Sequence, residues 1–182
     1  MHNDHHDDLI KRLELIVQEL KVRDDDEGDR QRTADSKLLS ALAALPIVIA
    51  LSTTAFVPLL KPLAAAGCVA LPLIALFLAA LVLFLVASIK AIVGLWPMRA
   101  KYAAIGLRTL SSFADEGSYI ELLKTVIKER GDVVRNNKEV NSGKLGLYAD
   151  AALYTVFGLI ALTLLVFCLV IVFAVNPKIF AT

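Results

Sequence analysis

Uncharged, mostly apolar runs alternate with charged stretches along this chain. Three runs contain no Asp, Glu, Lys or Arg: 23 residues over 38–60, 28 residues over 62–89 and 27 residues over 151–177. A helix needs about 20 apolar residues to cross the hydrocarbon core of a bilayer, and no run alternates with the period of two that a transmembrane strand shows. Because backbone polar groups in lipid must bond to one another, the three runs predict three transmembrane helices.

The first two predicted spans form a helical hairpin. Its turn lies around Pro58, Lys61, Pro62 and Gly67, since proline and glycine interrupt helices. The second span is expected to end near Trp96, because tryptophan favours the membrane interface.

The resulting fold class is all-α, an integral membrane protein with three transmembrane helices and cytoplasmic helical segments. Four parts are expected along the chain: an N-terminal amphipathic helix and connector at 1–37, the two-span hairpin at 38–97, a cytoplasmic helical region at 98–150, and the third transmembrane helix with a short tail at 151–182.

Both charged regions contain helical signals. In the first, apolar residues recur every three to four positions, which is typical of an amphipathic helix; they are Leu9, Ile10, Leu13, Ile16, Val17 and Leu20. The acidic run at 24–29 offers no apolar face, so a break or solvated connector is expected there. In the second region, Ser118 and Glu121 match a capping box. The helix that begins there has room to continue through Lys144 into the third span.

Composition and charge agree with a membrane protein. The chain is 57% hydrophobic with a mean hydropathy of +0.66, which is too apolar for an ordinary soluble domain. Its net charge of +1 gives no reason to expect nucleic-acid binding. Lys and Arg gather before the first span and between the second and third spans. The positive-inside rule therefore places the N-terminus and residues 98–150 in the cytoplasm, and the hairpin turn and C-terminus outside.

Small and hydroxyl residues within the spans suggest how the helices pack. Ser40 with Ala44, and Ala75 with Ala79, are four residues apart, a spacing that allows two helices to approach closely. The hydroxyls at positions 52–54 either line an aqueous path or bond to carbonyls of their own helix, and we favour the second interpretation.

The sequence contains no recognisable catalytic or metal-binding motif. No ionisable residue lies in the middle of a span, which argues against a proton relay, an intramembrane protease or a transporter. Cys68 and Cys168 do not form a metal-binding pair. The three histidines occur only at positions 2, 5 and 6, in a polar terminus that we expect to be solvated. We therefore predict no enzyme activity, no catalytic residues and no metal.

Two polar clusters lie at the predicted cytoplasmic mouth of the spans. The first surrounds Arg32, and the second precedes the third span. Cations in these clusters suit a phosphate, and amides suit a base or ribose; interfacial snorkelling and helix capping are the alternative. On this basis the candidate ligand-binding residues are Arg32, Asp35, Lys37, Arg135, Asn137, Asn141 and Lys144.

The order of these segments resembles the Pycsar-type transmembrane effectors of bacterial anti-phage defence, with the SLATT-like membrane effectors as a near alternative. An amphipathic helix leads into Arg32, Ala34, Asp35 and Lys37, then a two-span hairpin and a helical segment. An Asn- and Lys-bearing helix then continues into the third span, where Asn137, Lys138, Asn141 and Lys144 correspond.

This resemblance implies a membrane effector in the cell inner membrane that binds a cyclic nucleotide, cyclic UMP or cyclic CMP among the candidates, supplied by a partner cyclase. Binding would impair membrane integrity and lead to growth arrest or cell death. A homo-oligomer is expected, because three largely uncharged helices enclose no polar pore alone. The alternative is a constitutive membrane scaffold or assembly factor that recruits a partner through its N-terminal helix.

Overall fold

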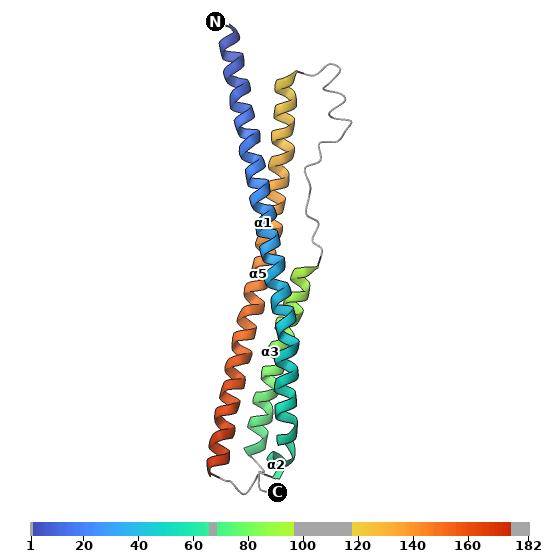
Figure 1. Ribbon diagram of the computed structural model, residues 1–182, viewed down its shortest axis with the longest axis vertical. Helices are drawn as coiled ribbons and strands as arrows, with labels where there is room; N and C mark the ends of the chain where they lie inside the picture. The colour runs from blue at the N-terminus through green and yellow to red at the C-terminus, as the bar shows by residue number, and fades with distance from the viewer. Residues whose placement is uncertain (1, 66–68, 97–117, 176–182) are drawn as a thin grey trace. The chain divides into compact units, whose positions relative to one another are not determined.

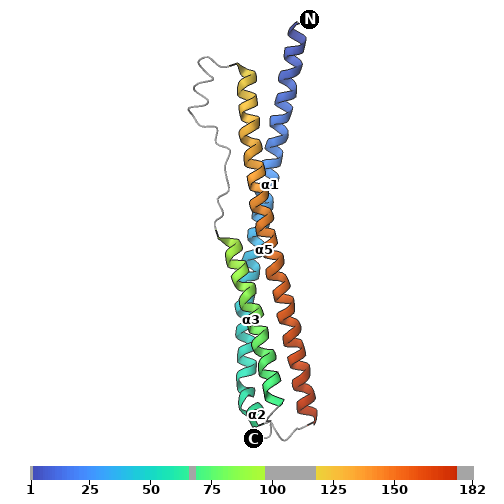
Figure 2. The ribbon, with the colours of Figure 1, turned by 180° about the vertical axis from the view of Figure 1, so that it is seen from behind.

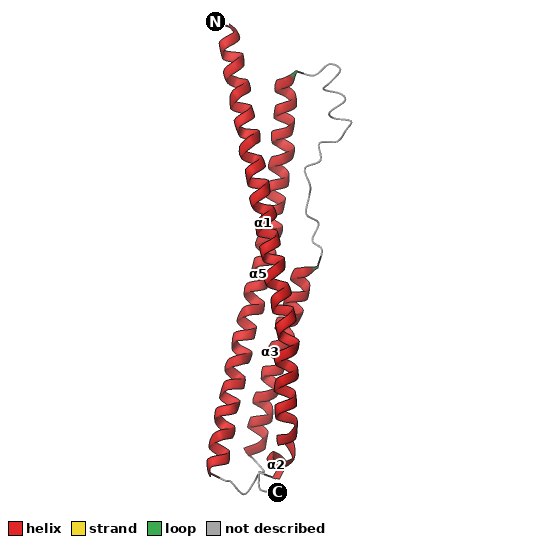
Figure 3. Ribbon diagram, viewed as in Figure 1, coloured by secondary structure: helices red, strands yellow, loops and turns green. Residues whose placement is uncertain are grey.

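The computed structural model describes residues 2–65, 69–96 and 118–175, and these residues are helical apart from short ends (Figure 3). The elements are helix α1 (His2–Phe56), the 3-10 turn η1 (Val57–Leu59), and helices α2 (Leu60–Ala65), α3 (Ala70–Leu95) and α5 (Tyr119–Val175). The described residues contain no strand. The predicted all-α class is confirmed, and α1, α3 and α5 are each long and apolar enough to cross a membrane.

The chain divides into two compact units, which are described separately. The bundle unit comprises 35–96 and 145–182, and the coil unit comprises 1–34 and 97–144, each within the described ranges. The backbones of α1 and α5 are continuous between these two units. Figures 1 and 2 show the course of each helix.

In the bundle unit, α3 packs along one face whose buried positions alternate steps of three and four residues. These positions are Ala70, Leu73, Phe77, Ala80, Phe84, Ala87, Ala91 and Gly94. A step pattern that averages 3.5 residues is the packing pattern of coiled coils, in which side chains of one helix insert between those of another. Small and aromatic residues share this face, so α1 and α5 approach closely at some levels and enclose an aromatic ring at others.

The bundle core forms three successive levels. Leu38 of α1, Ala91 of α3 and Ala151 of α5 make one level. Leu45, Phe84 and Ala161 belong to the next, and Phe56, Phe77 and Leu165 belong to the last. The Phe56 and Phe77 rings stack there, with centroids 4.1 Å apart. From the first level to the last, residue numbers rise along α1 and α5 and fall along α3. Helix α3 is therefore antiparallel to α1, and α5 is parallel to α1.

Charged residues meet at the first of these levels. Lys90 Nζ lies 2.9 Å from an Asp150 carboxylate oxygen, and Lys37 Nζ lies 5.6 Å from the centre of the Tyr148 ring. Lys37, Lys90 and Asp150 are the sequence neighbours of Leu38, Ala91 and Ala151, so one charged boundary serves all three helices. Beyond it, the helices have uncharged lengths of about 28–38 Å at 1.5 Å per residue, which matches a hydrocarbon core of about 30 Å.

The hairpin lies where the sequence predicts it. Helix α1 ends at Phe56, and η1 and α2 contain Pro58, Lys61 and Pro62; Gly67 lies outside the described residues. Helix α3 ends at Leu95, and Trp96 is largely exposed, as expected for an interfacial anchor.

The predicted small-residue pairs make no close contact between helices of the same chain. Ser40, Ala44, Ala75 and Ala79 are exposed. The small residues that do lie in helix contacts occupy the heptad face of α3 and the facing side of α5, where spacing alternates between three and four rather than repeating every four.

Hydroxyl groups in the bundle bond to their own helices. Ser52 donates to the Val48 carbonyl at 2.6 Å, and Thr53 donates to the Ile49 carbonyl at 2.8 Å. The same bond occurs at Ser88, Thr155 and Thr163. These contacts confirm the favoured interpretation for Ser52 and Thr53.

The predicted break at the acidic run is wrong, since α1 continues through residues 24–29. Ion pairs within the helix join Arg23 to Glu19, Arg30 to Glu27 and Arg32 to Asp29. Pairs at these spacings each stabilise a helix by about 0.2–0.5 kcal/mol. The buried and half-buried positions of the run continue the three-to-four spacing of the preceding apolar positions. The inward face of α1 is therefore apolar before the run and polar within it.

The close contact between Gly158 and the Phe84 ring leads to a stability prediction. A Cβ atom on Gly158 would lie 2.6 Å from the nearest carbon of the fully buried Phe84 ring. We therefore expect Gly158→Leu to lower the free energy of unfolding by about 1–3 kcal/mol, because the packed ring cannot yield. The measurement is denaturant unfolding in detergent micelles, followed by circular dichroism.

Gly146→Leu is the matched control, because nothing lies within 4 Å of its Cβ position. That change is expected to be neutral or stabilising, since leucine favours helix over glycine. Equal losses in the two variants would contradict the packing described here.

Candidate polar site in the coil unit

The coil unit has an apolar core that becomes polar along its length. On α1, the buried and half-buried positions Ile10, Leu13, Val17 and Leu20 are followed in the same spacing by Asp24, Glu27 and Gln31. On α5, the buried positions Leu123, Val126 and Val133 are followed by Asn137, Asn141 and Lys144. We call the six polar residues the polar belt; they are Asp24, Glu27, Gln31, Asn137, Asn141 and Lys144.

The N-terminal amphipathic stripe is confirmed in part. Ile10, Leu13, Val17 and Leu20 lie on the inward face, whereas Leu9 and Ile16 are exposed. The inward positions alternate steps of three and four residues, and this narrow seam leaves the flanking apolar residues outside it.

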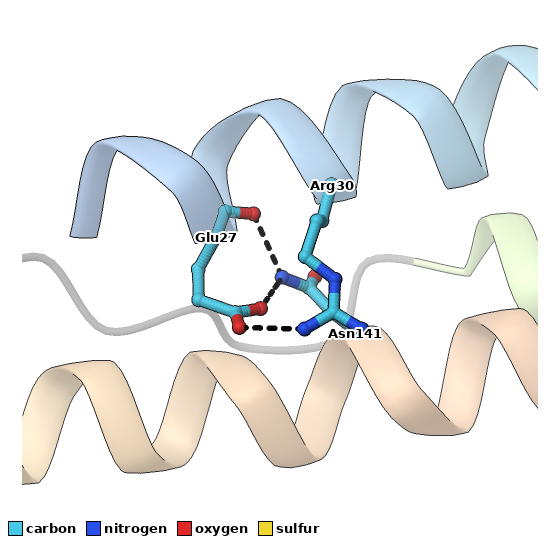
Figure 4. Close-up of polar contacts among 3 residues, drawn as sticks. All are labelled: Glu27, Arg30 and Asn141. Atoms are coloured by element: carbon cyan, nitrogen blue, oxygen red, sulfur yellow. Dashed lines mark hydrogen bonds and ion pairs between the residues drawn. The ribbon is translucent and has the colours of Figure 1, made fainter. Parts of the chain in front are cut away.

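A hydrogen-bonded group lies at the centre of the polar belt (Figure 4). Asn141 Nδ2 donates to both the backbone carbonyl and the Oε2 atom of Glu27, each at 2.8 Å. Arg30 donates to Glu27 Oε1 at 2.9 Å. Glu27 is 7% exposed and Asn141 is 1% exposed. The buried carboxylate therefore has one partner on its own helix and another on α5, so it helps to set the register between them.

Among the described residues of the coil unit, the buried polar atoms Asn141 Oδ1 and Arg130 Nε have no hydrogen-bond partner. Both belong to α5. An unsatisfied buried polar group costs about 1–3 kcal/mol. The free energy of forming this core is therefore less favourable than burial of its apolar side chains alone would give.

A groove of about 390 Å³ lies beside the belt. It is lined by Asp24, Asp25, Gly28, Asp29, Gln31, Arg32 and Asn137. Two predicted ligand-binding residues, Arg32 and Asn137, meet here. Arg32 pairs with Asp29 at 3.4 Å, and the other two aspartates give the groove an acidic character. Its amides suit a base or ribose, but its carboxylates oppose a phosphate.

The remaining predicted residues lie elsewhere. Arg135 pairs with Asp132 at 2.7 Å and lines a separate shallow groove with Asn136 and Glu139. Lys144 is 3% exposed and lies in the polar belt. Asp35 and Lys37 belong to the bundle unit, where Lys37 lies over Tyr148. The structure thus brings together Arg32 with Asn137 at the groove, and Asn141 with Lys144 in the belt.

Sequence reasoning missed Asp24, Glu27 and Gln31. All three stand in or beside an acidic run that resembles a solvated connector. The available signal was the spacing: Leu13, Val17 and Leu20 continue without interruption into positions 24, 27 and 31. Extending that register would have placed Glu27 inside the coil.

Another polar contact links the two helices toward the start of α5. The Tyr119 hydroxyl donates to Glu14 Oε1 at 2.8 Å. This hydrogen bond, with smaller contributions from desolvation and the Glu14 charge, raises the pKa of Tyr119. The neutral hydroxyl therefore persists at least as far into alkaline pH as that of a free tyrosine.

Helix α5 begins directly after Ser118, whose carbonyl accepts from the backbone N–H groups of Glu121 and Leu122.

Among the described residues, no group of three or more His, Cys, Asp or Glu side chains is arranged to hold a metal ion. No protein-family model, curated protein or solved structure matches the chain.

The Glu27–Asn141 contact generates a prediction for the coil unit. Asn141→Ala removes the amide that donates to Glu27, so the free energy of opening should fall by about 1–3 kcal/mol. Amide hydrogen exchange over residues 123–144, resolved by mass spectrometry, should accelerate about tenfold or more. Glu139→Ala, at an exposed position on the same helix, is the control and should leave exchange unchanged. Equal exchange in both variants would show that the contact does not stabilise the coil.

Proposed function

We propose that this chain is an integral membrane protein that crosses the bilayer three times. The support is the match between uncharged helix length and bilayer thickness, together with the surface of the bundle unit. Large apolar side chains are exposed there on all three long helices, including Leu51, Leu71 and Phe167. Water disfavours such a surface, whereas lipid solvates it.

The proposed location is the cell inner membrane, with the N-terminus and the coil unit in the cytoplasm and the C-terminus outside. The distribution of Lys and Arg supports this orientation. The charged boundary at Lys37, Lys90 and Asp150 is then the cytoplasmic edge of the hydrocarbon, and Lys61 lies near the opposite surface.

The proposed function is that of a non-enzymatic membrane effector whose spans respond to a signal received by the coil unit. One observation carries this proposal: α1 and α5 form the coil unit and also supply two of the three candidate spans, without a helix break between. A change in the pairing of α1 with α5 therefore reaches the spans through continuous helix. A ligand produces such a change only if it binds the two arrangements with different affinity.

The signal we propose is a cyclic nucleotide from a partner cyclase, and the active form is a homo-oligomer that impairs membrane integrity. The order of segments along the chain supports this choice of ligand. At the groove, Arg32 and Asn137 are the first candidates for contact. The acidic neighbours predict weak binding there, because each carboxylate repels the phosphate.

A topology measurement tests the proposed orientation. In a background with Cys68 and Cys168 replaced by alanine, Asp25→Cys and Lys61→Cys introduce thiols at exposed positions. In intact cells, a membrane-impermeant maleimide should label the second thiol and not the first. Disruption of the cells should expose both. Labelling of the first thiol in intact cells would overturn the orientation.

A leakage measurement tests the effector function. Purified protein in liposomes should release trapped dye when a cyclic nucleotide is added, with cyclic UMP, CMP, AMP and GMP tested separately. Arg32→Ala should raise the nucleotide concentration needed about tenfold, which corresponds to one charge-assisted hydrogen bond.

Arg12→Ala is the matched control, because Arg12 forms a similar exposed ion pair with Asp8 away from the groove. Its response should equal that of the unchanged protein. Absence of nucleotide-dependent release, together with absence of binding by calorimetry, would overturn the proposal. Partner capture that depends on residues 1–22 and not on nucleotide would instead favour the scaffold alternative.

A further inference from the structure

The cores of the two units differ in how well their polar atoms are satisfied. The buried side-chain atoms without hydrogen-bond partners in the described chain, Arg130 Nε and Asn141 Oδ1, both lie in the coil unit. That unit also buries Glu27 and Lys144, whereas the buried residues that the structure describes in the bundle unit are apolar. Desolvation of a polar or charged group opposes burial unless its contacts compensate fully.

Separation of α1 from α5 would relieve this cost. Asn141 Oδ1 has no donor in the closed coil and would gain one from water. Glu27 would lose Asn141 but retain Arg30, which lies on its own helix. Its charge therefore remains paired while its other oxygen becomes hydrated.

The helix at this place does not depend on α5 for its integrity. Ion pairs at Arg23–Glu19, Arg30–Glu27 and Arg32–Asp29 lie within α1. They remain after the two helices part. Opening at the polar belt is thus a separation of intact helices rather than their unfolding.

The apolar part of the coil has the opposite preference. Leu13, Leu123, Val126 and Val133 are buried, and the hydrophobic effect opposes their exposure by about 25 cal/mol per Å². A polar residue in such a seam sets register at a cost in stability. The two kinds of core together produce a coil that forms in one register and is weakest at its polar belt.

We propose that the polar belt is a built-in opening point, at which α1 and α5 separate as intact helices while the bundle unit stays packed. The opening is a property of the coil itself and holds whatever signal the protein receives. Its test uses a distance and is therefore independent of membrane leakage.

The experiment measures distances between spin labels on the full chain in lipid nanodiscs. Labels are placed at Gln18→Cys and Lys128→Cys, both exposed, in the background without native cysteines. The protein with the unchanged polar belt should show two populations of label-to-label distance, a short one from the closed coil and a long one from the open coil. Glu27→Leu combined with Asn141→Leu replaces both partners by apolar groups, which is expected to favour the closed coil, so the long population should fall about tenfold or more.

Asp26→Leu combined with Glu139→Leu is the matched control, because both positions are exposed, lie outside the belt and take no part in the ion pairs of α1 named above. It should retain both populations. A single short distance in the unchanged protein, or an equal long population with and without the leucine pair, would overturn the proposal.

A second variant keeps the test decisive if the leucine pair fails to fold by circular dichroism. Asn141→Ala weakens the closed coil without adding bulk, so the ratio of long to short populations should rise about tenfold. An unchanged ratio would overturn the proposal.

Discussion

The pairing of inward-facing positions along α1 and α5 is the constraint on which the other features depend. On α1 the positions advance by three and four residues from Ile10 to Phe56, and the corresponding positions on α5 continue from Leu123 past Leu165. One spacing therefore serves two units whose cores have different chemistry. The spacing fixes which side chains face inward. The residue type at each inward position then decides whether the helices are joined by apolar packing, as at Phe84, or by polar contacts, as at Glu27.

Much of the fold was predictable because its determinants are local. Length and absence of charge identify the three long apolar helices, and breaker residues identify the hairpin. The break predicted at the acidic run was wrong because only the composition of the run, which is typical of solvated connectors, was considered. Its inward positions in fact continue the helical spacing of the preceding Leu20. The small-residue pairs, chosen for their spacing of four, lie on a different face of the helix. The contact face of α3 follows alternating steps of three and four residues, as at Phe77, Ala80 and Phe84.

The candidate site was predictable only in its approximate position. Arg32 and Asn137 meet at one groove, as two clusters at the same predicted membrane surface suggest. The inward position of Glu27 follows from the local spacing, but its pairing with Asn141 does not, because the two residues lie 114 positions apart in sequence and no local pattern records such a pairing. Arg135 was grouped with Asn137 by proximity in sequence, but helical geometry turns it to a different surface, where it pairs with Asp132.

If the proposed oligomer encloses a passage, the hydroxyl groups of the bundle unit limit the character of that passage. Ser52, Thr53, Ser88, Thr155 and Thr163 already donate to carbonyls of their own helices. A conduit lined by these helices would therefore present walls that are mainly hydrocarbon. Hydrophobic constrictions conduct only when wide enough to stay wetted. Such a conduit would discriminate by diameter rather than by ionic charge, and it would close by expelling its water.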